Sequence, residues 1–287
     1  MTDTRDGIFG SVPEDEYHSD RGSLSVSGAK LLLPPSCPAK FREHIDNPPK
    51  PKPQYTFGHA VHSLVLGKGA TIIEVDAPDW RSKAAREQRD LACNGVAPIL
   101  TAELEIARAM ERVVREHPTA GPLFAGGDAE TSMYTTDPVT GVRLRGRADW
   151  LTVRDGRLWI CDYKTSTTSN PTDFARLAYT YRYFCQASWY IDLAIAVGLS
   201  DQPVFVDVCQ EKQPPYVVSV VEFDADALAE GRRLNRQAID LYAECVAADC
   251  WPAYGDGVHR IGLPQWVSRG HVDADAEALI KELEGLA

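Results

Sequence analysis

The dipeptide Asp155-Gly156 constrains the fold of this chain more than any other short feature. It lies between two runs, residues 142–153 and 157–164, in which apolar and polar residues alternate as they do in β-strands. Asp-Gly is a preferred pair for the centre of a type I′ turn, which joins two antiparallel strands. The sequence therefore predicts a hairpin in which Arg154 pairs with Arg157.

The hairpin also predicts which residues face each other farther from the turn. Stepping back one residue on each strand at a time places Asp149 opposite Asp162 and Arg147 opposite Lys164. Opposed residues have Cβ atoms about 4.5–5.5 Å apart, so the two carboxylates repel each other unless a cation lies between them. The turn therefore predicts a metal site on this face. The alternative is a surface salt-bridge network in which the arginines neutralise both carboxylates.

Strict alternation predicts cations beside this carboxylate pair. Arg145 and Arg147 would share a face with Asp149, and Asp162 and Lys164 would share the facing side of the next strand. The net charge of −11 argues against a nucleic-acid partner. However, bound metal ions change the local charge of a carboxylate-rich site, so local cations carry more weight than the total.

The rest of the sequence predicts an α/β fold, with a mixed β-sheet that contains an antiparallel meander and is flanked by helices. Residues 1–22 are polar and acidic and predict a flexible N-terminal lead-in. One folded domain is expected over 23–267, followed by an acidic helix or tail over 268–287. Helices are expected over 56–66, 101–117, 182–197 and 226–248, strands over 129–136, 142–153, 157–164, 204–209 and 217–223, and a proline-rich connector over 47–54.

An acidic residue followed by a strand that ends in Asp-x-Lys is the signature of the PD-(D/E)XK nuclease superfamily. Here the signature is Asp149 with Asp162-Tyr163-Lys164, and the flanking sequences GRADW and ICDYKTS resemble the RecB- and RecE-type branches. The layout of residues 23–266 resembles the RecE-type exonucleases of phage recombination systems. The resemblance implies a restriction-endonuclease-like core. Alone, Lys164 could equally be a surface lysine at a strand end.

Three outlying residues match the same branches. His62 in FGHAVH resembles their metal-binding histidine, and Gln186 and Tyr190 in QASWY match their QxxxY motif. The i, i+4 spacing places this pair on one face of a helix. Glu130 fits an additional acidic position and is expected within about one register step of Asp149. Taken singly, His62 could be a core histidine, and Gln186 and Tyr190 could serve helix packing.

The resemblance implies a site for one or two metal ions. Asp149, Asp162, His62 and the backbone carbonyl of Tyr163 would hold them, and Glu130 would complete a second-ion site. Oxygen ligands suit Mg²⁺ or Mn²⁺, and the imidazole favours tolerance of Mn²⁺.

The resemblance also implies roles for the remaining residues. Lys164 would orient or deprotonate the attacking water, and we favour the orienting role. Candidate contacts to the DNA backbone are Arg147, Thr165, Ser166, Gln186 and Tyr190.

A RecE-like nuclease would digest linear double-stranded DNA from 5′ to 3′ and leave a 3′ single strand for an annealing protein. It would form a ring-shaped homo-oligomer around the DNA. The polar N-terminus and the lack of a long apolar run predict a cytoplasmic protein without a membrane segment, in a bacterial host if a phage encodes it.

Two alternatives remain open at this point. One is a RecB-like or iron–sulfur nuclease that acts on single strands. The seven cysteines are scattered and contain no CxxC pair, which argues against an iron–sulfur cluster. The cysteines are expected to be mostly buried free thiols. The other alternative is a catalytically idle DNA-binding module on the same fold.

Overall fold

The computed structural model describes residues 6–10, 12–48, 55–90 and 96–263. The chain divides into two units, residues 1–252 and 253–287. In the second unit, residues 253–263 are described; they are exposed and contain no helix or strand. The expected tail over 268–287 lies outside the described residues. No helix in the described ranges is long and apolar enough to cross a membrane.

The core of the first unit is a mixed sheet with the strand order β1-β5-β6-β7-β8-β9, and β2 pairs with β6. Pairing is antiparallel except between β7 and β8 and between β2 and β6. The predicted mixed sheet with an antiparallel meander is thus confirmed. The strands of this sheet are β1 (Gly7–Phe9), β2 (Leu24–Ser25), β5 (Asp128–Thr136), β6 (Arg143–Arg154), β7 (Arg157–Ser166), β8 (Val204–Glu211) and β9 (Val218–Val221).

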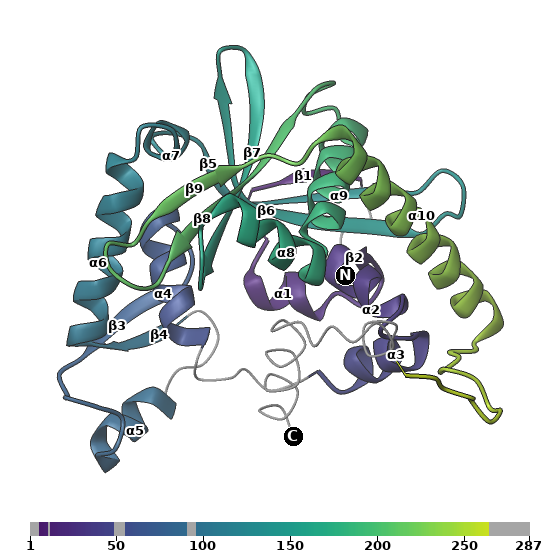
Figure 1. The fold of residues 1–287 in the computed structure, drawn as a ribbon, viewed down its shortest axis with the longest axis horizontal. Helices are drawn as coiled ribbons and strands as arrows, with labels where there is room; N and C mark the ends of the chain where they lie inside the picture. Colours follow the sequence, from purple (N-terminus) through teal and green to yellow (C-terminus); the bar gives the residue numbers. More distant parts are fainter. Residues whose placement is uncertain (1–5, 11, 49–54, 91–95, 264–287) are drawn as a thin grey trace. The chain divides into compact units, whose positions relative to one another are not determined.

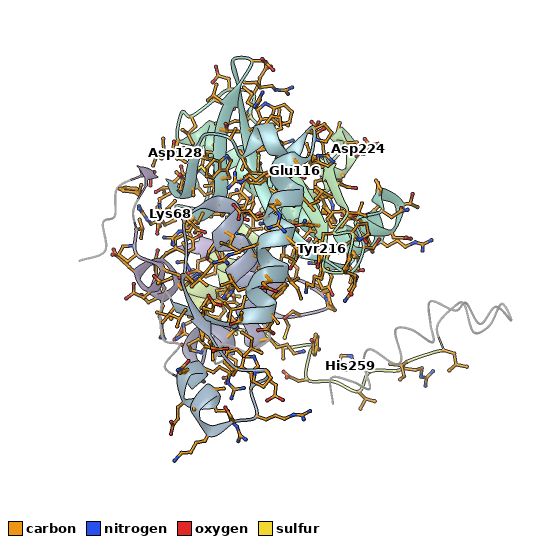
Figure 2. The ribbon with its side chains drawn as sticks, turned by 90° about the vertical axis from the view of Figure 1, so that its left-hand side faces the viewer. Lys68, Glu116, Asp128, Tyr216, Asp224 and His259 are labelled. Atoms are coloured by element: carbon orange, nitrogen blue, oxygen red, sulfur yellow. The ribbon has the colours of Figure 1, made fainter. Side chains whose placement is uncertain are left out.

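Helices cover both faces of this sheet (Figure 1). One face packs against α4 and α6, and the other packs against α2, α9 and α10. Figure 2, in which the α6 side faces the viewer, shows this helix in front with Glu116 near one end. The helices are α1 (Glu14–Ser19), α2 (Val26–Leu32), α3 (Pro38–Asp46), α4 (Tyr55–Leu66), α5 (Lys83–Asp90), α6 (Thr101–Glu116), α7 (Ala120–Leu123), α8 (Pro171–Tyr181), α9 (Tyr183–Ala196) and α10 (Ala225–Ala248), and β3 (Thr71–Val75) pairs with β4 (Val96–Leu100) in a small second sheet.

The hairpin predicted from Asp155-Gly156 is present. Both turn residues have positive φ, 52° and 73°, as a type I′ turn requires. Arg154 pairs with Arg157, and the predicted register continues as far as Trp150 opposite Cys161. The turn chemistry alone therefore sets the alignment of the two strands that carry the site.

The predicted helix boundaries agree with the structure to within one or two residues where the sequence supplies a signal. Helix α4 ends before Gly67, whose φ of +66° terminates the helix as expected. Asp224 caps α10 by accepting a hydrogen bond from the Ala227 amide. Helix α8 was not expected; Arg182, in the left-handed region at φ 54°, separates it from α9.

The N-terminal segment, expected as a flexible lead-in, packs on the main sheet over its described part, residues 6–10 and 12–22. Strand β1 pairs with β5, and Tyr17 of α1 is buried. The guanidinium groups of Arg145 and Arg147 lie 5.0 and 4.1 Å from the centre of the Tyr17 ring, and Asp20 lies 3.2 Å from Arg145. These cation–π contacts and the ion pair hold residues 12–22 against strand β6, although the polar composition of this segment predicted disorder.

The described cysteines carry free thiols. Of these, five are buried and Cys250 is exposed. The expectation of mostly buried free thiols is confirmed for the described part of the chain; Cys93 lies outside it.

Candidate active site

Part of the candidate site lines a cleft of about 800 Å³ between α4, the N-terminal segment and the middle strands of the main sheet, whereas Asp149, Asp162 and Lys164 are not among the lining residues. His62 of α4, Glu130 of β5, Arg147 of β6 and Tyr163 and Thr165 of β7 all line it. Sequence reasoning selected each of these residues. The fold therefore brings together side chains that lie up to 103 residues apart in sequence (62 to 165).

His62 lies between two carboxylates. Its Nε2 atom is 3.1 Å from Oδ2 of Asp149, and its Nδ1 atom is 3.9 Å from Oε1 of Glu130. The amide of Tyr163 also donates a hydrogen bond of 3.0 Å to Oδ2 of Asp149. The pairing of β6 with β7 ends at Trp150 opposite Cys161, so Asp149 is the first residue of β6 beyond the paired region.

Strands β5 and β6 both change faces at Glu130 and Asp149. Ala148 packs in the core beneath α9, whereas Trp150, two residues later, packs in the core beneath α4 and α6. Regular alternation would place both on one face. The register of β5 and β6 is the same on both sides of these two residues, and Glu130 has a φ of 55°, a left-handed value uncommon for residues other than glycine.

This change of face corrects one prediction. A Cβ atom on Gly146 would lie 2.6 Å from side-chain atoms of Tyr190 in α9, so the neighbouring Arg147 points away from that helix. Lys164, in contrast, contacts Gln186 of α9. The predicted opposition of Arg147 and Lys164 is therefore wrong, because strict alternation does not continue through Asp149.

Lys164 and Asp162 form the second half of the site. The Lys164 ammonium donates to Oδ2 of Asp162 and, at 3.2 Å, to Oε1 of Gln186. Gln186 in turn donates through Nε2 to Oδ1 of Asp162 at 2.5 Å. The ammonium also lies 4.2 Å from the centre of the Tyr183 ring. The predicted Asp-x-Lys pair and the first residue of QxxxY therefore form one hydrogen-bonded group.

The charges around His62 depend on one another. Burial disfavours the imidazolium, but the adjacent Asp149 and then Glu130 raise the pKa of His62 to about 9. Burial also opposes ionisation of Asp149, yet the His62 charge holds the pKa of Asp149 below its ordinary value. Burial and repulsion from Asp149 raise the pKa of Glu130. A cation at this point stabilises both carboxylates.

Asp162 and Lys164 likewise shift each other's pKa. Burial and then repulsion from Asp149 raise the pKa of Asp162, although Lys164 partly offsets both. Burial disfavours the ammonium of Lys164, but Asp162 and Asp207 raise its pKa well above the ordinary value. Lys164 therefore stays protonated at neutral pH. Pairing of β6 and β7 ends at Trp150 opposite Cys161, one step before Asp149 and Asp162, so the direct opposition of the two carboxylates stays a prediction.

Comparison with known families agrees with this geometry. Residues 25–261 match the family described as “PDDEXK-like domain of unknown function (DUF3799)”. The chain belongs to this family. No curated protein matches the sequence.

The PDDEXK-like domain also resembles solved structures. A protein from Eubacterium rectale described as a “putative exonuclease” superposes with a TM-score of 0.61 at 13% identity, covering 91% of this chain and 99% of that chain. This similarity confirms the restriction-endonuclease-like fold. The protein SSO0001 gives a TM-score of 0.35 at 16% identity over 77% of each chain, a value too low to bear on the fold.

The donor set of the PDDEXK-like domain suits a divalent ion. In the described ranges, no three His, Cys, Asp or Glu side chains already converge as a metal cage. Instead, protonated groups lie against the carboxylates, His62 against Asp149 and Lys164 against Asp162. Carboxylate oxygens crowded around a cation are ligands that Mg²⁺ and Mn²⁺ prefer, so the residues fit the ion that the family implies.

The five candidate DNA contacts have different surroundings. Arg147 and Thr165 line the cleft, but the Arg147 guanidinium also donates to the Val12 carbonyl at 2.8 Å. Tyr190 is buried and its hydroxyl donates to the Arg147 carbonyl at 2.8 Å, while buried Ser166 accepts from the Thr168 amide at 3.3 Å. Tyr190 and Ser166 are therefore suited to holding the backbone beside the site in place rather than to contacting DNA. Gln186 acts on Asp162 and Lys164, as described above.

Sequence reasoning missed several ionisable residues: Asp207 and Lys30 near Lys164, and, along the cleft, Glu14, His18, His59, Lys68 and Lys212. Asp207 of β8 is fully buried, and its Oδ1 atom lies 3.6 Å from the Lys164 ammonium. Lys30 of α2 lies 5.7 Å from the centre of the Tyr183 ring; burial and then repulsion from Lys164 lower the pKa of Lys30 to about 8. A charged residue inside the otherwise apolar run Val204–Val208 was the available signal for Asp207.

Proposed function

We propose that this PDDEXK-like domain hydrolyses phosphodiester bonds of linear double-stranded DNA with the help of Mg²⁺ or Mn²⁺. The observation that carries the proposal is the contact of the Lys164 amino group with Asp162, together with the neighbouring His62–Asp149 pair. Carboxylates, an imidazole and one cation that remains charged are the groups that metal-assisted phosphate hydrolysis uses. Family membership supports a nuclease, since the matched region includes all these residues.

The protein groups have separable tasks in this reaction. Asp149, Asp162, His62, Glu130 and the Tyr163 carbonyl would hold one or two ions. A divalent ion bound there would polarise the phosphate and activate the attacking water.

Lys164 acts by charge and hydrogen bonding. Because the carboxylates of Asp162 and Asp207 face its ammonium, we assign Lys164 to donating to the attacking water or to a phosphate oxygen. Gln186 fixes the Asp162 carboxylate by donating to its second oxygen. The cleft lined by His62, Glu130 and Tyr163 would admit the DNA backbone, with Arg147 and Thr165 as candidate phosphate contacts.

The finer proposal is an exonuclease of RecE type. Resemblance to that type supports digestion from 5′ to 3′, a 3′ single strand left for an annealing protein, and a ring-shaped homo-oligomer around the duplex. The fold shared with the E. rectale protein described as a “putative exonuclease” also supports cleavage from chain ends.

The test is digestion of linear duplex DNA with Mg²⁺ or Mn²⁺, with separate 5′ and 3′ end labels and a closed circular duplex as control. Lys164→Ala is compared with Lys83→Ala, a matched change at an exposed lysine of α5. We expect early loss of the 5′ label, intact circles, a Lys164 variant that keeps only a small residual rate and an active Lys83 variant. Equal cleavage by both variants would refute the assigned site, and duplex binding without cleavage by the wild type would indicate an idle DNA-binding module.

A further inference from the structure

Asp207 is a buried carboxylate at the centre of the sheet for which the proposed chemistry has no role so far. It lies on β8 directly beside Asp162 of β7 in the parallel register. Phe205, two residues earlier on β8, packs in the core beneath α9. Since side chains two apart on a strand share a face, Asp207 points to the same face as Phe205, where it meets Lys164. None of its side chain is exposed to solvent.

This carboxylate is poorly compensated. Within the described part of the chain, neither Oδ atom accepts a hydrogen bond, and the Lys164 ammonium at 3.6 Å is its ion-pair partner. A buried charge without hydrogen bonds is unfavourable for folding. In agreement, burial raises the pKa of Asp207 to about 7. A requirement for stability does not explain an ionisable side chain here.

The surroundings of Lys164 supply an explanation. Its ammonium has Asp162 and Gln186 on one side, Asp207 on the neighbouring strand and the Tyr183 ring at 4.2 Å. Asp162 is also a proposed ligand of the divalent ion, so it shares its charge between that ion and Lys164. Asp207 lies outside the proposed ligand set, so its charge is not shared with the ion and acts on the ammonium.

We propose that Asp207 is a positioning residue that holds the Lys164 ammonium in place for the reacting phosphate. The inference rests on the proposed nuclease function. It explains why a poorly compensated carboxylate lies beside Asp162: its cost in stability is accompanied by placement of the Lys164 ammonium. Asp207 itself does not touch the DNA.

The test compares Asp207→Asn, which keeps the shape and removes the charge, with Asp192→Asn. Asp192 is an exposed carboxylate of α9 that pairs with Arg232 at 2.9 Å, so the control removes a similar charge away from the site. We expect Asp207→Asn to lower kcat by about 10- to 100-fold with little change in KM. Its thermal midpoint at pH 8 should equal or exceed that of the wild type, since a buried charge is removed. Asp192→Asn should keep the wild-type kcat.

A double-mutant cycle with Lys164→Ala isolates the route of action. If Asp207 acts through Lys164, adding Asp207→Asn to the Lys164→Ala protein lowers the residual rate no further. An equal further loss in that background would overturn the inference, and so would an unchanged kcat in the single variant. A single variant that melts well below the wild type would assign Asp207 a structural role and also overturn it. Failure of the wild type to cleave any DNA would instead refute the proposed function.

Discussion

Replacing His62 by asparagine should change how the stability of the metal-free protein depends on pH. The rise in the His62 pKa from 6.5 to about 9 corresponds to about 3 kcal/mol of preference for the imidazolium in the folded state. The imidazole is about three-quarters buried, with 26% of its side chain exposed, so solvent screens its contact with Asp149 only in part. Because the folded pKa is raised, this stabilisation is fully present below pH 6.5 and is lost as pH rises through 9.

The assay is urea unfolding of the chelator-treated wild type and of His62→Asn at pH 6 and at pH 9.5. We expect the difference in unfolding free energy between the two proteins to shrink by up to about 3 kcal/mol from the lower to the higher pH. The figure is an upper bound, because Glu130 and Asp149 can take up protons in the variant. The same difference at both pH values would refute the His62–Asp149 contact as described.

Three further predictions concern the same site and its support. Tyr190→Phe removes the hydrogen bond to the Arg147 carbonyl and should lower the unfolding free energy by about 1 kcal/mol in urea, whereas Tyr179→Phe on the exposed face of α8 should leave it unchanged. Gly146→Ala places a Cβ atom 2.6 Å from the Tyr190 ring and should destabilise by about 1–3 kcal/mol in the same assay; an unchanged midpoint would contradict the close approach. Binding of Mn²⁺ at pH 7.5 should release a proton from His62, which calorimetry in buffers of different ionisation enthalpy measures as a buffer-dependent heat, absent in His62→Asn.

Much of the site was predictable because local chemistry determines it. The Asp155-Gly156 turn sets the register of the hairpin, and that register brings the strand segments of Asp149 and Asp162 to the same level. Helical spacing places Gln186 and Tyr190 on one side of α9, where both contact the central strands. Such features need only neighbouring residues in the chain.

Other features depend on contacts between distant segments and could not be predicted. The N-terminal segment reads as disordered, yet the burial of Tyr17 against Arg145 and Arg147 holds it on the sheet. The neighbouring sequence does not predict the change of face at Glu130 and Asp149. Glutamate rarely adopts a left-handed conformation, so contacts with other segments must hold Glu130 in it. The change of face explains why Arg147 points away from α9, whereas Lys164 contacts Gln186 of that helix.

We propose that His62, Asp149, Asp162 and Lys164 form one metal-dependent hydrolytic centre. The decisive test is single-turnover cleavage of a linear duplex by the wild type, Asp149→Asn and Asp162→Asn, each with Mn²⁺ and with chelator. We expect cleavage by the wild type with Mn²⁺ alone and a loss of at least about 100-fold in both folded variants. Cleavage that persists in chelator, or wild-type rates in either variant, would contradict it.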